Sequence, residues 1–567
     1  MTKENKSFLN NKILCYLCGN AKHIWYAICI AFLVLVWQRV ETANGAAGWI
    51  EGFRDMAGFS VAGLILPHLE PSRLKKYKKL FLGWTMIGLI IIGIGIFWPI
   101  FDRNLLADRI ILSIELAIWG FLAIYTLLSI FKEKKYTRLT PWFMVPWGMM
   151  ELWMIFSRST YKWPLAFAGM FLIFYLTDFS KEEEKDIVRG MINGLILSFF
   201  CLQGWSLLYR PFDVYRYTGA FTNSSQTALF YLFVLAAVYG KLVSVTRTGE
   251  HRLVKLFYWL GACVVLAFIV MPASRLGWAV GAIFTVIYLI VYSFQRGKSY
   301  LIRFGALMLM ITILLVPVCY VAVRYIPALR HHPVWLNGEY SEERVHSWDP
   351  IDSEKYRSWY QFTESISYRL RETMEALGES ADISFVAYAK EKKDPTKYLP
   401  EEVPEKGTKK WKKWANSLPV NIEEAGNGTD TRFKLYEYCF KRMNLRGYTL
   451  SEQPFWLSHY MYAFHCHDIF LQFGTDFGWP VFYLFVGLCL ATIIVLVRRG
   501  VKEIKAGRIH EENFTKLLIF LIPMTFGAME YCWGSGSLAV ILMYIIWRSL
   551  AVKESKAENP SKCPTAS

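Results

Sequence analysis

The sequence predicts an all-α polytopic membrane protein with about fourteen transmembrane helices, in a range of about 12 to 14, and one large, mostly helical extracytoplasmic loop. The chain of 567 residues is 54% hydrophobic and 17% aromatic, which is more apolar side chain than a soluble domain usually carries. Uncharged stretches such as 80–100 are long enough to cross about 30 Å of hydrocarbon. Basic residues also alternate between successive connections, as membrane topology requires.

Fourteen apolar windows follow one another along the chain. They lie at 22–38, 50–67, 79–100, 109–131, 141–157, 162–179, 187–208, 226–243, 254–272, 277–295, 303–325, 469–497, 514–530 and 535–550. The second carries Glu51, Arg54 and Asp55 in its first turns, and the last is short. The predicted domains are helices 1–11 in 1–325, an extracytoplasmic loop domain in 326–466, helices 12–14 in 467–550 and a cytoplasmic tail in 551–567.

The formal net charge of +17 is unevenly distributed. Residues 327–466 contain 20 Lys and Arg against 21 Asp and Glu, whereas the rest of the chain contains 43 against 25. The excess lies in alternate short connections, at 73–79, 132–138, 181–189, 247–255, 296–303 and 498–508. Because Lys and Arg accumulate in cytoplasmic loops, both termini are predicted to be cytoplasmic. Membrane orientation therefore explains the charge without a nucleic-acid partner.

Two segments of the large loop have apolar side chains at helical spacing, namely Ile366, Leu370, Met374 and Leu377, and Phe433, Tyr436, Phe440 and Met443. This spacing predicts two amphipathic helices over the outer face. Of the eleven cysteines, Cys439 and Cys466 fall in or beside this loop, and most others lie in apolar stretches. The cysteine spacing predicts no disulfide framework.

Arg216 stands shortly before the eighth window, in the segment Arg-Tyr-Thr-Gly-Ala-Phe-Thr-Asn-Ser. Asn223 or Ser224 can cap the helix that follows. A helix N-terminus beside an arginine is an anion site, because its N–H groups and its dipole both favour negative charge. The alternative is an interfacial arginine whose charged end reaches the lipid headgroups.

Arg275 follows Ser274 in a short turn between the ninth and tenth windows. On the predicted topology this is the extracytoplasmic side, where the positive-inside rule disfavours a basic residue. Charged residues near the membrane are costly and are candidates for function. Two arginines on one face, each at a helix end, predict a clamp for a diphosphate.

His465, Cys466, His467 and Asp468 open the twelfth window. These residue types can bind a metal, but no second cluster with metal-ligand spacing appears in the sequence. A pair of interfacial histidines without chemistry is a second interpretation. The third is a general base, because the imidazole pKa lies near neutral pH and Asp468 can orient a neighbour.

Together these segments resemble the O-antigen ligase and O-antigen polymerase superfamily of membrane glycosyltransferases. Members look like many-span proteins with a large periplasmic loop near the C-terminal third and short motifs in a set order. The matching residues are Arg216, Gly219, Phe221 and Asn223; Ser274 and Arg275; His467, Leu471, Gln472 and Gly478; and, in a fourth segment, Asp430, Thr431 and Arg432. The resemblance extends over residues 185–490.

Two residues depart from the family pattern. Asp468 stands where the family usually has Asn, and Leu276 replaces a small residue after the arginine. The first departure changes the expected tuning of His467, because an anion raises the pKa of a nearby imidazole and an amide does not.

The resemblance implies a GT-C-like bundle in a bacterial cytoplasmic membrane. It implies a donor glycan on undecaprenyl diphosphate and a glycan or lipid acceptor, with no cofactor and no metal. Arg216 and Arg275 would bind the diphosphate, and His467 would accept the proton of the acceptor hydroxyl, with inversion at the anomeric carbon. Supporting roles fall to Asn223, Ser274, Arg432 and Asp468. The sequence does not separate ligase from polymerase.

Two other classes of function share some of these features. A lipid-linked oligosaccharide flippase or another multi-pass transporter would have the same spans, but ionisable residues near the midplane and related halves are then expected. Glu115 and Glu151 are the main intramembrane acids, and no paired halves are evident. A non-catalytic scaffold or sensor would use the large loop as a binding module.

Overall fold

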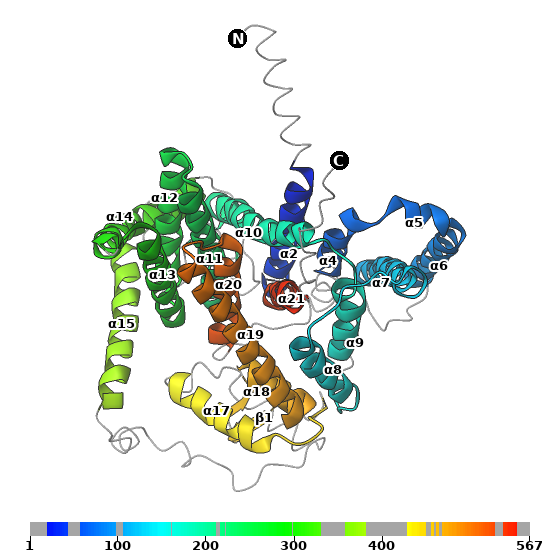
Figure 1. Ribbon diagram of the computed structural model, residues 1–567. Helices are drawn as coiled ribbons and strands as arrows, with labels where there is room; N and C mark the ends of the chain where they lie inside the picture. Colours follow the sequence, from blue (N-terminus) through cyan, green and yellow to red (C-terminus); the bar gives the residue numbers. More distant parts are fainter. Residues whose placement is uncertain are drawn as a thin grey trace, which may run out of the picture.

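The computed structural model describes residues 20–42, 57–97, 106–159, 162–210, 212, 216–221, 223–297, 299–329, 358–381, 428–449, 455–458, 461–463, 466, 468–527 and 537–552. Regular structure in these segments is helical except for one small antiparallel hairpin (Figure 1). The fold is therefore the all-α class that the sequence predicts.

The helices alone make up the first half of the chain. They are α2 (Ala21–Thr42), α4 (Ala57–Ile65), the short helix η1 (Leu66–His68), α5 (Pro71–Lys76), α6 (Lys78–Phe97), α7 (Leu106–Leu128), η2 (Ser129–Glu133), α8 (Pro141–Ile155), α9 (Lys162–Gly169), η3 (Met170–Tyr175), α10 (Lys181–Tyr209) and α11 (Ser224–Thr248). The second half contains α12 (Arg252–Val270), α13 (Arg275–Arg296), α14 (Ser299–Leu329), α15 (Trp359–Ala381), α17 (Gly428–Arg442), β1 (Phe455–Ser458), β2 (Met461–Ala463), α18 (Ile469–Phe477), α19 (Trp479–Lys505), α20 (Glu511–Gly527) and α21 (Leu538–Ala551).

Among the described residues, eight helices are long and apolar enough to cross a membrane. They are Lys78–Phe97, Arg109–Glu133, Glu182–Tyr209, Ser224–Thr248, Arg252–Val270, Arg275–Arg296, Tyr300–Pro327 and Trp479–Lys505. Every one of the fourteen predicted windows contains a helix, but the others are shorter or less apolar. The multi-pass membrane class is confirmed, and the count of fourteen stays a prediction.

The twelfth window is two helices, and the prediction of one continuous span over 469–497 is wrong. The chain breaks at Gly478, whose φ of +97° favours glycine. A Cβ there would lie 2.2 Å from the backbone oxygen of Leu445, and the Trp479 N–H donates to the Asn444 carbonyl at 2.9 Å. The break therefore receives a turn from a distant segment, which the apolar pattern of the window does not reveal.

The centre of the bundle is α11, most of whose residues are buried. Small residues let its neighbours approach closely. A Cβ on Gly240 would lie 1.9 Å from Thr515 Oγ1 of α20, and a Cβ on Gly277 of α13 would lie 2.9 Å from that of Ala228. The Tyr239 and Tyr288 rings stack with centroids 4.6 Å apart, so α11 and α13 run side by side along their length.

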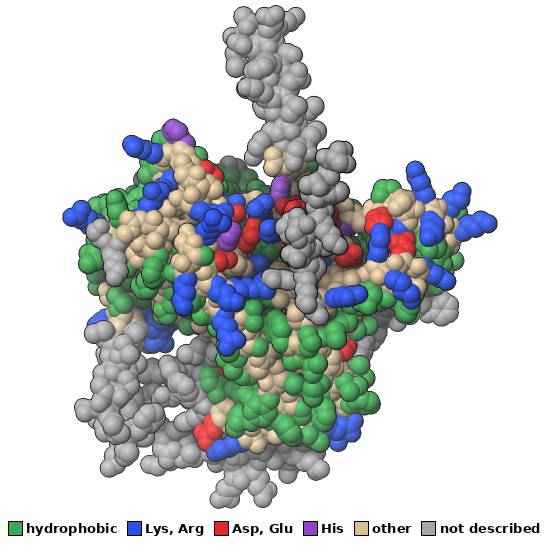
Figure 2. All heavy atoms as spheres, viewed as in Figure 1, with side chains coloured by type: hydrophobic (Ala, Val, Ile, Leu, Met, Phe, Trp, Pro, Cys, Tyr) green, Lys and Arg blue, Asp and Glu red, His purple; other side chains and the backbone are tan. Residues whose placement is uncertain are grey.

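Connections predicted to share one side do contact one another, and we call this end of the bundle the basic face. Ion pairs link Lys22 to Glu183 at 3.2 Å, Arg73 to Glu133 at 2.7 Å and Arg189 to Glu512 at 3.1 Å. Figure 2 shows most Lys and Arg side chains gathered across the upper part of the view, with hydrophobic side chains below them. The alternation of basic connections therefore corresponds to a real face of the folded chain.

Both segments predicted as amphipathic loop helices are helical, in α15 and α17. Figure 1 places α15, α17 and β1 beyond the bundle, on the side away from α5 and the start of α2. Stacking of Tyr320 on Phe362, with ring centroids 5.4 Å apart, attaches α15 to the end of α14.

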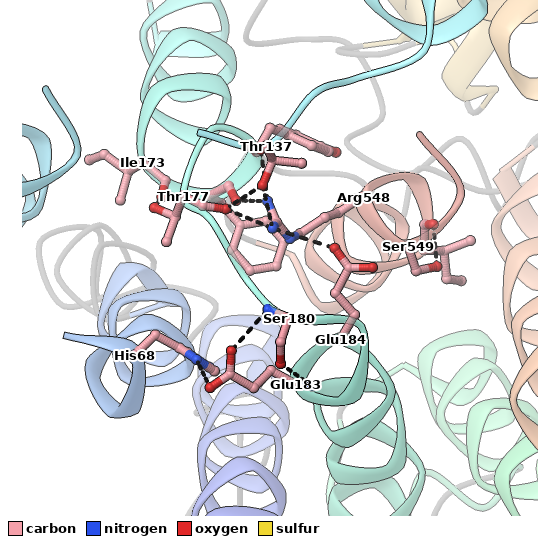
Figure 3. A network of polar contacts seen from close by, with 12 residues as sticks. His68, Thr137, Ile173, Thr177, Ser180, Glu183, Glu184, Arg548 and Ser549 are labelled. Atoms are coloured by element: carbon pink, nitrogen blue, oxygen red, sulfur yellow. Dashed lines mark hydrogen bonds and ion pairs between the residues drawn. The ribbon is translucent and has the colours of Figure 1, made fainter. Parts of the chain in front are cut away.

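Arg548 of α21 is the hub of a buried polar network at the basic face (Figure 3). Its side chain is 2% exposed. It donates to the carbonyls of Phe174, Tyr175 and Thr177 and to Thr137 Oγ1, and it lies 3.5 Å from a carboxylate oxygen of Glu184. One guanidinium thus joins α21 to the end of η3, to the 134–140 connection and to α10.

We expect Arg548→Ala to lower the stability of the purified protein by about 3–5 kcal/mol, because it leaves a buried carboxylate and several carbonyls without their donor. Arg548→Lys should restore little of this loss, since one ammonium cannot span the same acceptors. Thermal unfolding in detergent, followed by tryptophan fluorescence, measures the change. Arg498→Ala, at an exposed position of α19, is the matched control. Equal melting temperatures for the two alanine variants would contradict the role given to Arg548.

Candidate anion site at two helix N-termini

The N-terminus of α11 is built by the segment 216–221, which we call the first turn. Asn223 caps the helix, as predicted, with its side-chain oxygen 2.8 Å from the Ser225 N–H. Gly219 has a φ of +54° and lets the chain reverse before the helix. Buried Arg210 donates to the Gly219 carbonyl at 3.1 Å and to Thr218 Oγ1 at 3.2 Å. The backbone before α11 is therefore held from the preceding span.

The N-terminus of α13 is built by residues 271–275, the second turn. Ser274 is 4% exposed, and its Oγ accepts from the Gly277 N–H at 3.3 Å, so it caps the helix that Arg275 begins. Ala273 has a φ of +48°, a region that costs a residue with a Cβ about 1–2 kcal/mol. Strain of this kind persists where the surroundings hold the backbone and is common at functional sites.

The structure brings the two turns together. Arg216 Nε donates to the carbonyl of Pro272 at 2.9 Å, so the first turn lies directly on the second. At the other end of the same helices, Arg296 Nη2 donates to the Thr246 carbonyl at 3.2 Å. Since α11 and α13 are in contact at both ends, they run parallel, and both N-termini point to the face opposite the basic face.

This arrangement has the electrostatics of an anion site. Each helix N-terminus carries roughly half a positive charge, and N–H groups of its first turn point outward along the axis. Arg216 and Arg275 add two permanent cations beside these ends. A guanidinium presents donors in a planar fork that matches the oxygens of a phosphate. The joined turns can therefore bind a phosphate or diphosphate through backbone and side-chain donors together.

Sequence reasoning missed two buried arginines at this end of the bundle. Arg210 ends α10 and holds the first turn, as described above. Arg324 of α14 is 4% exposed, and its guanidinium lies 5.0 Å from the ring centre of Tyr325. Both stand at ends of predicted spans on the side poor in basic residues, so the argument applied to Arg275 identifies them as well.

The third motif lies at the start of α18. His467 and His465 are outside the described residues, but both neighbours of His467 are described. Cys466 is fully buried, and its N–H donates to Gln472 Oε1 at 2.8 Å, while Gln472 Nε2 donates to Asp476 at 2.8 Å. Gln472, one of the motif residues, therefore fixes the backbone that leads into position 467.

Asp468 serves the backbone of α18. Its Oδ1 accepts from the Leu471 N–H at 2.8 Å as the N-cap of the helix. Burial raises the pKa of this carboxyl from 3.8 to about 6, although hydrogen bonds from the helix backbone oppose the rise. Asp468 was predicted as a support for His467, and the contact that the structure shows is with its own helix. Arg432 lies in α17, and its side chain is outside the described part.

The segment around Asp468 is attached to the rest of the protein by α17 and α19, against which α18 packs. The rings of Phe473 and Phe485 stack with centroids 4.6 Å apart, and Trp163 packs edge-on against Phe473 at 5.0 Å. The described contacts thus unite the two arginine turns and, separately, the start of α18 with α19.

Comparisons with protein families, with curated proteins and with solved structures found no match to this chain.

We expect Gly219→Ala to lower stability by about 1–2 kcal/mol, because alanine is strained at positive φ. Its Cβ would also lie 3.1 Å from the Tyr231 hydroxyl. Gly261→Ala is the matched control, since that helical glycine has open space around its Cβ position and the substitution should not lower stability. Thermal unfolding of both variants measures the difference. A Gly219→Ala protein as stable as the Gly261→Ala protein would contradict the backbone described for the first turn.

We expect Asp468→Asn to be more stable than the wild type above pH 6, by at most about 3 kcal/mol. A carboxyl with a raised pKa keeps its proton longer in the folded state, so wild-type stability falls as the pH rises from about 4 to about 6. Asparagine keeps the capping oxygen and does not titrate. The advantage should therefore shrink toward pH 4.

Melting temperatures of both proteins between pH 4 and pH 8 test this expectation. Asp468→Ala is the control, because it removes the cap and should be less stable than Asp468→Asn at every pH. A constant difference between wild type and Asp468→Asn over the whole range would rule out the buried titration.

Proposed function

We propose that the protein is a glycosyltransferase of the O-antigen ligase and polymerase type. It transfers a glycan from a polyprenyl diphosphate donor to an acceptor hydroxyl on the outer face of a bacterial cytoplasmic membrane. In this proposal the chain crosses the membrane fourteen times, the basic face is cytoplasmic, and α15, α17 and the hairpin belong to the extracytoplasmic loop. The alternative, a flippase for the same lipid-linked glycan, would share the donor but not the transfer.

The observation that carries the proposal is the hydrogen bond from Arg216 to the Pro272 carbonyl. It joins two arginine-bearing turns and two helix N-termini on the face opposite the basic face. Cleavage of a sugar–phosphate bond leaves negative charge on the departing diphosphate, and fixed cations stabilise that charge in the transition state. Each charge-assisted hydrogen bond contributes roughly 1.5–3 kcal/mol. Arg216 and Arg275 would hold the diphosphate without a metal.

In the same proposal His467 is the general base. It accepts the proton of the acceptor hydroxyl as the oxygen attacks the anomeric carbon, and the diphosphate leaves from the opposite side, which inverts the configuration. Gln472 would support this step by holding the Cys466 backbone, and Asp468 by starting α18 directly after the histidine. The histidine loop and the arginine turns come from segments far apart in the chain.

The test is to incubate purified protein with a polyprenyl-diphosphate glycan and candidate acceptors, and to identify the product by mass spectrometry. We expect transfer that persists in EDTA and is lost in His467→Ala. Arg275→Lys should slow transfer by about tenfold or more, because a lysine cannot form the bidentate contact. Arg498→Ala, on the opposite face, is expected to keep full activity.

Binding of the donor separates the roles of these residues. His467→Ala should still bind the polyprenyl-diphosphate glycan, whereas Arg216→Ala with Arg275→Ala should not. Full transfer by His467→Ala would remove the histidine from the mechanism. Donor binding and translocation without any transferred product would support the flippase instead.

A further inference from the structure

Two cysteines meet at the end of the molecule away from the basic face. Cys439 lies near the end of α17 and Cys466 lies just before α18, and both side chains are fully buried. They form a small cluster with Leu435 and Leu471. The two thiols are hydrogen-bonded to each other, and the Cys466 sulfur also lies 3.4 Å from Thr475 Oγ1. Thiols in direct contact need little movement to reach the bonding distance of about 2.05 Å.

The location of this pair distinguishes it from the other described cysteines. Cys29, Cys201, Cys263, Cys319 and Cys489 lie in apolar helices of the bundle. The pair lies where α17 packs on α18, and β1 and β2 lie between its members in the chain. Disulfides form and persist in oxidising compartments outside the cytoplasm. On the proposed orientation this end of the chain faces such a compartment.

We propose that Cys439 and Cys466 form a disulfide that ties α17 to the start of α18. The two thiols lose two protons and two electrons as the sulfur–sulfur bond forms. The electrons pass to an oxidised protein of the dithiol–disulfide class, whose own disulfide is broken and leaves as two thiols. Exchange proceeds through a mixed disulfide, so each thiolate attacks in turn.

The bond forms while this region folds and is then protected. In the folded state both sulfurs are buried, and burial raises the pKa of the Cys466 thiol well above its usual range, so little thiolate is present to react. The same burial shields the finished disulfide from reductants. It is therefore a structural bond and not a switch.

The ring closed by this bond contains the turn that inserts at Gly478 and the β1–β2 hairpin. It fixes the backbone next to position 467 from one side, while Gln472 fixes it from the other. The disulfide depends on which way the chain faces in the membrane and does not depend on the proposed glycosyl transfer. It also corrects the expectation, drawn from cysteine spacing, that no disulfide is present.

The test maps thiols in the full-length protein purified from membranes. The chain is denatured in detergent without reductant and labelled with iodoacetamide, then reduced and labelled with an isotopically heavy form of the reagent. We expect the heavy label on Cys439 and Cys466 and the light label on Cys201 and Cys489. A cross-linked peptide two hydrogens lighter than the sum of its parts should join the pair before reduction.

Matched variants complete the experiment. In Cys439→Ala the light label should move onto Cys466, whereas Cys489→Ala should leave the pair unchanged. Light label on both Cys439 and Cys466 in the wild type would overturn the disulfide. Because this readout needs no substrate, it stays informative if the transfer assay fails, and a normal transfer assay does not rescue it.

Discussion

Gly240 and Gly277 let α11 lie in direct contact with α20 and α13, and the other helices are arranged around this contact. Helices in a membrane gain little from the hydrophobic effect against one another, so close packing at small residues carries much of the association. A side chain at either glycine would meet Thr515 or Ala228 at less than van der Waals distance. Because the contact extends from one end of α11 to the other, α13 is held parallel to it, and the two N-termini arrive at the same place.

The two ends of the bundle use arginine differently. At the basic face, arginines are paired with acids, as Arg73 is with Glu133 and Arg189 with Glu512. At the opposite end, the hydrogen bonds of Arg210 and Arg216 to Gly219, Thr218 and Pro272 go to neutral oxygens, which position the guanidinium groups without adding negative charge. The first arrangement stabilises connections between helices. The second suits a site whose ligand brings the anion.

The start of α18 shows how motif residues support a reactive position without touching substrate. Gln472 binds the Cys466 backbone, and Asp468 caps the helix. An asparagine at 468 offers the same capping oxygen, so the departure from the family pattern leaves this backbone role intact. The proposed Cys439–Cys466 bond would add a covalent restraint to the same segment. Three separate restraints then converge on the two residues that flank His467.

The sequence by itself determined the helical membrane class, the alternation of basic connections, the caps at Asn223 and Ser274, and the helices α15 and α17, because each of these follows from residues close together in the chain. Only the tertiary structure decided the union of Arg216 with Pro272, the break at Gly478, the burial of Arg210, Arg324 and Arg548, and the meeting of Cys439 with Cys466. Each of these depends on contacts between segments distant in the chain, which apolar periodicity and charge counts do not encode.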